Sequence, residues 1–236
     1  MDFTLSEEQE MLKKSARDFL GIECPKKVVR EIEASDLGYS PELWKKMASL
    51  GWMGLALPEE YGGAGLSLLD MAVLFEEFGR AAMTEPMFST VVLGALPILA
   101  WGTEEQKKAF LPKVAAGDLF LTLAMAEPKV NEDPSFISTR AMTKDDGFLI
   151  HGTKLFVPYA HIADYLLVVA RTRGIAGDRK GITVFIVDRK AQGINITPLA
   201  TIAADKQFEV SFDKVFVPSK NILGSLHNGL RLITET

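Results

Sequence analysis

Residues 103–126, TEEQKKAFLPKVAAGDLFLTLAMA, contain the change of pattern that decides the fold. The opening TEEQ has the form of a capping box, in which Thr103 and Gln106 begin a helix that runs to about Ala116. Gly117 fits the end of that helix. The run that follows, LFLTLAMA, is short and apolar, as is typical of a buried strand. The sequence therefore predicts helices before Gly117 and strands after it.

The part of the chain before Gly117 carries repeated helix-start signals. Residues 6–9 form a second capping box, SEEQ, and Ser40-Pro41 places a capping serine before a proline at the first helical position. Apolar or small side chains then recur at spacings of three and four residues. The predicted helices begin near Ser6, Ser40, Ser67, Phe88 and Thr103.

After Gly117 the apolar stretches are short, rich in Val, Ile, Phe and Thr, and separated by turn signals such as DDG at 145–147. Such regular short strands favour an antiparallel barrel or sandwich. We therefore predict an α+β protein with an all-helical N-terminal domain (residues 1–118), a β middle domain (119–227) and the start of a further helix (228–236). The predicted strands cover residues 119–126, 139–144, 148–157, 165–171, 182–187, 194–199 and 207–215.

Composition excludes several classes of protein. The 236 residues are 47% hydrophobic and 24% charged, which is typical of a globular chain. Residues 1–120 hold 12 basic against 19 acidic residues and the remainder 14 against 12, so neither half has the basic patch of a nucleic-acid binder. No apolar run reaches the roughly 18 residues of a membrane span. The acidic start, MDFTLSEEQE, does not resemble a secretory or mitochondrial presequence, and we expect a cytoplasmic protein.

A search for generic chemistry assigns no site. His151, His161 and His227 have no partner ligand three or four residues away, so we expect solvated or core histidines and no metal site. Cys24 has no intramolecular disulfide partner; its two nearby lysines would lower its pKa, but a lone cysteine near a helix end is usually structural. Residues 61–65, YGGAG, lack a lysine and favour a tight loop with positive φ over a phosphate-binding loop.

Four stretches of sequence, considered together, say more about function than the histidines, Cys24 or the glycine-rich loop. They are LPEEYGGAGLS at 57–67, GTEEQKKAFLPKVAAG at 102–117, AMAEP at 124–128, and FEVSFDKVFVPSKNILG at 208–224. In this order and spacing they resemble the acyl-CoA dehydrogenase family, flavoenzymes that oxidise acyl-CoA thioesters to enoyl-CoA. The resemblance covers nearly the whole chain. It implies the first two parts of a three-part architecture, whose third part is a C-terminal four-helix bundle.

The resemblance also implies ligands and partners. We expect FAD as the cofactor, an acyl-CoA substrate, electron-transfer flavoprotein or a similar acceptor, and a homo- or hetero-oligomer. The family's catalytic base is a Glu in the bundle, so no catalytic residue is assigned here. Cofactor contacts are implied for the backbone of Met125 and Ala126, for Phe156 as a cover over the flavin ring, and for Pro158.

Two of these cofactor positions depart from the family pattern. Ala126 stands where the family has a Thr before Glu-Pro, and Pro158 replaces a second Thr and removes an N–H. Losing two neutral donors, at roughly 0.5–1.5 kcal/mol each, would weaken FAD binding about tenfold or more. Tyr159 and His161 are the nearest replacement donors, or else they are loop residues without a ligand.

The substrate side departs as well. The family's Gly-x-Gly-Ser-Asp becomes KVNED at 129–133, so Glu132 replaces the Ser that contacts the acyl-CoA or flavin side, while Asp133 is retained. A carboxylate at Glu132 would repel a phosphate, whereas Lys129 would attract one. Leu93, Leu96 and Leu99 either line the acyl pocket or belong to the core.

Three interpretations follow from the resemblance. The first is a flavin-dependent acyl-CoA dehydrogenase, represented by its first two domains. The second is a non-catalytic or FAD-poor subunit of a hetero-oligomeric acyl-CoA dehydrogenase, which the substitutions at Ala126, Glu132 and Pro158 favour. The third is another use of the fold, such as an acyl-CoA oxidase or a nitroalkane-oxidising or monooxygenating relative, and no residue selects it.

Overall fold

The computed structural model describes residues 4–129 and 133–235, which form two compact units. One unit comprises Met1–Glu85 with Ala115–Asp118, and the other comprises Pro86–Val114 with Leu119–Thr236. We describe each unit separately. The helical part of the chain is shared between them, because residues 86–114 associate with the strands. A helical N-terminal region followed by a mostly antiparallel sheet confirms the predicted fold class.

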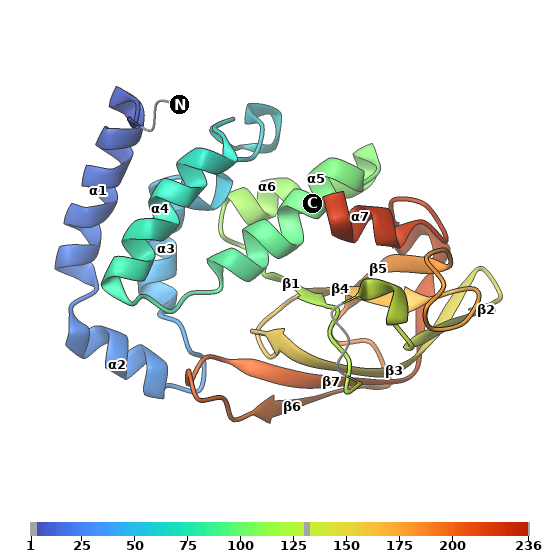
Figure 1. The fold of residues 1–236 in the computed structure, drawn as a ribbon. Coiled ribbons are helices and arrows are strands. Elements are labelled where there is room, and N and C mark those ends of the chain that lie inside the picture. The colour runs from blue at the N-terminus through green and yellow to red at the C-terminus, as the bar shows by residue number, and fades with distance from the viewer. Residues whose placement is uncertain (1–3, 130–132, 236) are drawn as a thin grey trace. The chain divides into compact units, whose positions relative to one another are not determined.

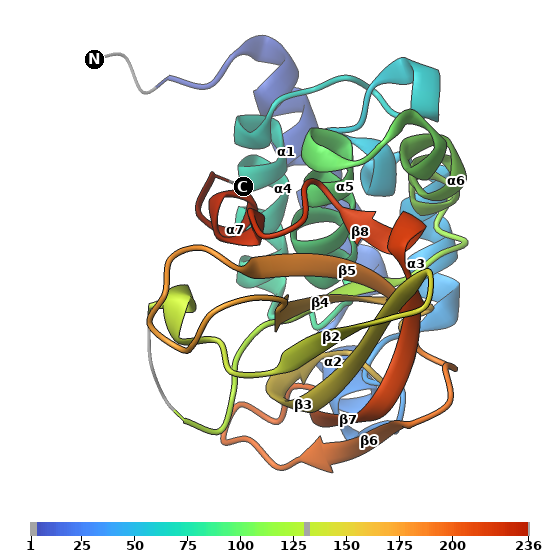
Figure 2. The same ribbon diagram turned by 90° about the vertical axis from the view of Figure 1, so that its right-hand side faces the viewer.

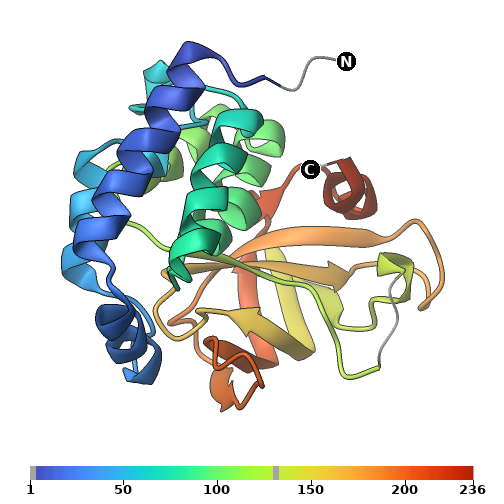
Figure 3. The same cartoon turned by 60° about the vertical axis from the view of Figure 1, so that its left-hand side comes forward.

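The first unit is helical, and its two longest helices, α1 and α4, lie side by side (Figures 1 and 3). The capping box predicted at Ser6 is formed, Ser40 caps α3, and the helix predicted to begin near Ser67 also starts with a capping box, which Ser67 forms with Asp70. Helix α2 was missed by the sequence analysis, because Pro25 at its N-cap supplies no side-chain hydrogen bond. The elements are α1 (Glu7–Glu23), α2 (Lys26–Ala34), α3 (Pro41–Ser49), η1 (Trp52–Gly54), η2 (Glu59–Tyr61) and α4 (Leu68–Ala81).

Buried aromatic side chains form the centre of this unit. The Trp52 ring lies 5.1 Å from the Phe19 ring and 5.7 Å from the Phe78 ring, measured between centroids. Trp52 is 3% exposed, so the rings join α1, η1 and α4 in one core. Such aromatic pairs stabilise a core by about 0.5–1.5 kcal/mol each beyond their burial.

The loop that contains YGGAG is held by close backbone contacts. Gly62 has a φ of 80°, which favours glycine, and a Cβ on Gly63 would lie 2.0 Å from the carbonyl oxygen of Leu57. The glycines at these two positions are therefore explained by backbone geometry, as the tight-loop interpretation predicted.

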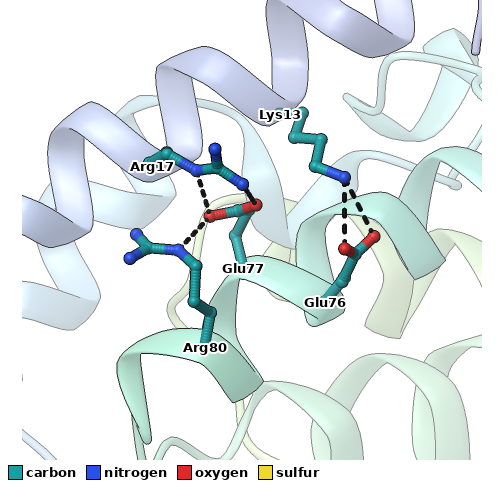
Figure 4. Close-up of polar contacts among 5 residues, drawn as sticks. All are labelled: Lys13, Arg17, Glu76, Glu77 and Arg80. Carbon is teal, nitrogen blue, oxygen red and sulfur yellow. Dashed lines mark hydrogen bonds and ion pairs between the residues drawn. The ribbon is translucent and has the colours of Figure 1, made fainter.

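A buried carboxylate connects α1 to α4 (Figure 4). The Glu77 side chain is fully buried and accepts hydrogen bonds from Arg17 on α1, at 2.6 and 3.1 Å, and from Arg80 Nε at 2.6 Å. These two arginines hold the pKa of Glu77 at about 2, below its ordinary 4.5. The neighbouring pair, Lys13 and Glu76, is exposed on the glutamate side and joins the same two helices.

We expect Glu77→Gln to destabilise the protein in a pH-dependent way. Because the folded-state pKa lies below 4.5, the ionised carboxylate stabilises the fold above that pH, and the contribution is lost as the pH falls towards 2. Solvent at the half-exposed arginines screens the charges, so we expect a loss of about 2 kcal/mol at pH 7. Urea unfolding between pH 2 and pH 7 measures this loss of stability. Glu76→Gln is the matched control, and we expect it to lower the free energy of unfolding by less than about 1 kcal/mol. A difference between wild type and Glu77→Gln that does not change with pH would contradict this explanation.

The second unit contains an eight-stranded sheet whose order is β6-β7-β3-β2-β4-β5-β8, with β1 paired to β4 (Figure 2). Most pairs are antiparallel, whereas β1 runs parallel to β4, and β2 meets β4 in parallel at Arg140 and Arg171. The strands are β1 (Leu121–Ala124), β2 (Arg140–Lys144), β3 (Gly147–Pro158), β4 (Tyr165–Arg171), β5 (Ile182–Asp188), β6 (Ile194–Leu199), β7 (Gln207–Pro218) and β8 (Ile222–Leu223).

Helices of the second unit pack against this sheet. The single helix predicted over 88–101 is a π-helix, η3 (Phe88–Ala95), followed directly by α5 (Leu96–Trp101). A Cβ on Gly94 of η3 would lie 2.3 Å from Leu121 Cβ, so glycine permits η3 to lie directly on β1. The other helices are α6 (Glu104–Ala115), a 3-10 turn η4 (Pro134–Phe136), a 3-10 turn η5 (Ser219–Asn221) and α7 (Gly229–Glu235).

Helix α6 is fastened to the sheet through its own capping residue. The Gln106 side chain accepts from the Thr103 N–H at 3.0 Å, which completes the predicted capping box. Its amide nitrogen then donates to the carbonyls of Lys220 and Ile222, at 3.0 and 2.9 Å. Across residues 4–129 and 133–235, no helix combines the length and hydropathy needed to cross a membrane.

Candidate functional site

The end of β1 runs beside β3, and hydrogen bonds fix the two segments together. The Leu155 N–H donates to the Ala126 carbonyl at 2.9 Å, and Lys154 Nζ donates to the Met125 carbonyl at 3.0 Å. Nearer the start of β1, the Thr122 hydroxyl donates to the carbonyl of Pro158 at 2.6 Å. The structure therefore brings the segment around Met125 and Ala126 to the part of β3 that contains Phe156 and Pro158.

A buried ion pair lies under this junction. Lys154 Nζ is 2.8 Å from Glu127 Oε1, and the side chains are 0% and 7% exposed. The Glu127 carboxylate also accepts from the Ser138 N–H and hydroxyl, at 2.8 and 2.5 Å, and from the Thr139 N–H at 2.8 Å. All the partners needed to keep a buried carboxylate ionised are present.

The pKa values of the pair reflect burial and mutual attraction. Burial alone would raise the pKa of Glu127, but the charge of Lys154 and the hydrogen bonds hold it at about 2. Burial lowers the pKa of Lys154 to about 8, against the opposing effect of the Glu127 charge. The pair is therefore ionised at neutral pH and fastens β1 to β3.

An irregularity in β3 presents Phe156. The pairing of β3 with β7 shifts register between Lys154 and Val157, and Phe156 has a φ of 52°, which is uncommon for an aromatic residue. Its side chain is 59% exposed. Ala126 is also exposed, and its main chain is one hydrogen bond away, through Leu155. The bulge therefore directs an aromatic ring outward next to the end of β1.

A small cavity of about 150 Å³ adjoins the end of β1. Asp133 is among its lining residues; its carboxylate accepts from the Ser135 N–H at 2.8 Å, and that bond lowers its pKa. Glu132, the other predicted substrate residue, lies outside the described residues. The cavity is lined by Met125, Ala126, Glu127, Lys129, Asp133, Pro134, Phe136 and Ile137.

A second cavity, of about 230 Å³, is almost entirely apolar. It lies among η3, α5, β1, β4, β5 and α7. Leu93 lines it, whereas Leu96 and Leu99 are not among its lining residues. Met125 lines both cavities, so both adjoin the end of β1. The apolar cavity is lined by Val92, Leu93, Pro97, Leu123, Met125, Leu167, Val184, Leu232 and Ile233.

Comparison with known proteins identifies the family. The model described as acyl-CoA dehydrogenase, N-terminal domain, matches residues 6–118, and the model described as acyl-CoA dehydrogenase, middle domain, matches residues 122–215. The chain belongs to the acyl-CoA dehydrogenase family. The resemblance drawn from the four sequence stretches is thereby confirmed.

Similar proteins cover this acyl-CoA dehydrogenase family chain from end to end. The acryloyl-CoA reductase (NADH) of Anaerotignum propionicum is 32% identical and is matched over 60% of its length by 100% of this chain. The caffeyl-CoA reductase-Etf complex subunit CarC of Acetobacterium woodii is 32% identical, with 98% of this chain and 62% of the relative covered. The solved ChsE4-ChsE5 complex from Mycobacterium tuberculosis superposes with a TM-score of 0.87 at 31% identity, covering 100% of this chain and 60% of that one. The chain spans about 60% of the length of these relatives.

The residues at the β1–β3 junction fit the flavin that this family implies. An isoalloxazine ring needs a flat apolar contact and donors for its ring nitrogens and carbonyls. Phe156 supplies an exposed ring, and the N–H groups of Met125 and Ala126 donate to no acceptor within residues 4–129 and 133–235. Two backbone donors thus stand beside the position where Ala126 lacks a hydroxyl.

Three further candidates from the sequence are His161, Tyr159 and Cys24. The His161 ring stacks on Phe208 with 4.5 Å between centroids, and Tyr159 lies next to it. The expectation that lysines lower the Cys24 pKa is wrong: burial, with the charges of Glu85 and Glu23, raises it to about 11. Within the described ranges, no group of three or more His, Cys, Asp or Glu side chains could hold a metal ion.

Sequence reasoning did not assign Lys154 and Glu127 a role in the site. One signal was available, because Lys154 occupies an inward-facing position in a predicted strand, and a buried lysine requires a charged partner. Glu127 stands in the AMAEP stretch that carries the resemblance, but Lys154 lies 27 residues further along the chain. Only the folded packing of the segment after β1 against β3 brings the two together.

Proposed function

We propose that this chain provides the FAD-binding part and the inner wall of the acyl site of a flavin-dependent acyl-CoA dehydrogenase. One observation carries the proposal: Met125 lines both the small cavity that Ala126 also lines and the apolar cavity under η3. A flavin beside Ala126 and an acyl chain in the apolar cavity would therefore meet at the end of β1. Oxidation of a carbon–carbon bond next to a thioester requires that meeting.

Each residue of the site then has a role. Phe156 covers one face of the flavin ring, and the N–H groups of Met125 and Ala126 donate to its polar edge. FAD, when bound, supplies the acceptor for the hydride that leaves the acyl β-carbon. The apolar cavity that includes Leu93 and Met125 excludes water from the acyl chain, and Lys129 attracts the phosphorylated part of the substrate.

The carboxylates of the small cavity are not proposed as the base that removes the α-proton. Glu127 is ionised but committed to Lys154, Ser138 and Thr139. Asp133 caps η4 through the Ser135 N–H. We therefore assign no catalytic residue within the described part of the site, and the full oxidation is proposed for an assembly that also provides the base.

Restoring the two missing hydroxyls tests the cofactor site. We expect the double variant Ala126→Thr, Pro158→Thr to bind FAD about tenfold more tightly than wild type, because each neutral hydrogen bond contributes roughly 0.5–1.5 kcal/mol. Titration followed by flavin absorption measures the affinity. Ala200→Thr, on the exposed segment after β6, is the control and should leave it unchanged. Equal affinity in all three proteins would contradict the proposed flavin contacts.

A second candidate function is supported by the same substitutions. Ala126 and Pro158 suit a FAD-poor subunit that pairs with a flavin-competent homologue, and the similar ChsE4-ChsE5 structure is a complex of two named chains. Electron-transfer flavoprotein is the proposed acceptor, since the similar CarC is a subunit of a complex with Etf. The flavin content of the purified assembly separates the candidates. One FAD per copy of this chain favours the enzyme, and FAD only on the partner favours the subunit.

A further inference from the structure

Arg171, at the end of β4, is a buried cation that bonds main-chain carbonyls. Arg171 is 1% exposed, and among residues 4–129 and 133–235 no carboxylate lies at ion-pair distance from it, although the charges of Asp178 and Glu127 act on it. Nε donates to Ile137 at 2.7 Å, one terminal nitrogen donates to Ser135, and the other donates to Asp178 and Lys180 at 3.2 Å. The planar guanidinium, with five N–H donors, suits a ring of carbonyls that a lysine could not span.

These carbonyls belong to two different loops. Ser135 and Ile137 lie in the segment 134–139, which contains η4, whereas Asp178 and Lys180 lie in the hairpin 172–181 between β4 and β5. The loops also touch directly, because the Gly177 N–H donates to Ser135 at 2.9 Å. Arg171 therefore holds both loops from the inside of the unit.

The first of these loops also holds the end of β1. The N–H groups of Ser138 and Thr139 donate to Glu127, and the Thr139 carbonyl accepts from the Arg171 N–H at 2.7 Å. Pro134 and Ile137 line the small cavity beside Met125 and Ala126. An unbroken series of hydrogen bonds thus runs from the hairpin, through Arg171 and 134–139, to Glu127.

The hairpin carries positive charge around its own hollow. Arg173, Arg179 and Lys180 line a space of about 530 Å³, which His227 and Asn228 also border. The Asp178 carboxylate is used inside the hairpin, where it accepts from the Ile175 N–H at 2.9 Å. Such a hairpin suits an anionic group, as in a phosphorylated substrate.

We propose that Arg171 is a positioning residue that makes the basic hairpin and the cofactor-facing end of β1 order together. Only the identity of the ligands rests on the proposed function; the mechanical link between the two loops does not. Loosening the hairpin should therefore loosen residues 135–139, and with them the hold on Glu127, as long as Arg171 is present.

Hydrogen exchange on the 236-residue chain, without FAD, tests the link. Asp178→Ala removes the bond to Ile175 but keeps the carbonyl that Arg171 contacts, so it loosens the hairpin alone. We expect faster exchange in the hairpin and, by at least threefold, in the amides of 136–139. In an Arg171→Lys background the same change should spread to 136–139 much less, because the Gly177–Ser135 bond is then the main remaining link between the loops. The proposal would be overturned if Asp178→Ala accelerated exchange only in the hairpin while Arg171 is present. It would also be overturned if the acceleration spread equally to 136–139 with and without Arg171.

Two further measurements separate this inference from the proposed function. Arg171→Lys alone should accelerate exchange in both loops, whereas Arg189→Lys should not, because Arg189 contacts the single carbonyl of Ala163 at 2.7 Å. FAD titration of wild type tests the flavin site itself. Coupled exchange without FAD binding would refute the proposed function and leave the role of Arg171 standing. FAD binding without coupled exchange would refute the role of Arg171 and leave the proposed function standing. If the exchange is coupled and FAD binds, Arg171→Lys should weaken FAD binding severalfold.

Discussion

Replacing Lys154 by Met should lower the free energy of unfolding by about 3–5 kcal/mol, because it leaves the Glu127 carboxylate buried without its charged partner. The same change removes the bond from Lys154 to the Met125 carbonyl, so the end of β1 loses two of its fastenings to β3. We expect FAD binding to be lost as well. Urea unfolding and FAD titration measure the two effects.

The matched control is the pair of Lys107 and Glu104, at 3.0 Å on α6, which is exposed on the glutamate side. Lys107→Met should cost less than about 1 kcal/mol, since solvent screens an exposed pair. The double variant Lys154→Met, Glu127→Gln should recover part of the stability, because it removes the unpaired charge. A small loss in Lys154→Met, similar to that in Lys107→Met, would contradict a structural role for the buried pair.

Gly94→Ala should be the next most damaging change, at about 2–3 kcal/mol. The new Cβ would lie 2.3 Å from Leu121 Cβ, and Leu121 is only 1% exposed, so η3 has to move away from β1. That movement alters the apolar cavity that Leu93 and Met125 line. We therefore expect weaker binding of an apolar chain in addition to a lower thermal midpoint.

Gly79→Ala is the control for this change. Gly79 lies within α4, and a Cβ there would meet nothing within 4 Å. Alanine is the better helix former, so this variant should gain up to about 1 kcal/mol. Thermal unfolding of both variants gives the comparison. If Gly94→Ala were as stable as wild type, the close packing of η3 on β1 would be wrong.

Local signals in the sequence were sufficient where one residue determines one element. The capping boxes predicted at Ser6 and Thr103 lie at the observed helix starts, because their hydrogen bonds span three residues. Helix α2 lacks such a signal, and Pro25 at its start reads as a turn. The π-helical geometry of η3 has no sequence signature, since its apolar pattern also fits an α-helix.

The candidate site was predictable in composition but not in connection. Met125, Ala126, Phe156 and Pro158 followed from the resemblance, and the structure brings their segments together. The residues that hold them, Lys154, Glu127 and Arg171, act between strands far apart in the sequence. Their roles depend on strand register and on burial, which no local pattern encodes.

The most direct test of the flavin site is a titration of the 236-residue chain with FAD, followed by its absorption difference spectrum and compared with Phe156→Ala. We predict a saturable spectral change that Phe156→Ala weakens about tenfold, because the variant removes an aromatic contact. Phe216→Ala, which changes a phenylalanine of β7 that is 43% exposed, should leave the affinity unchanged. No saturable change, or identical affinity in wild type and Phe156→Ala, would contradict the proposal that this junction holds the flavin.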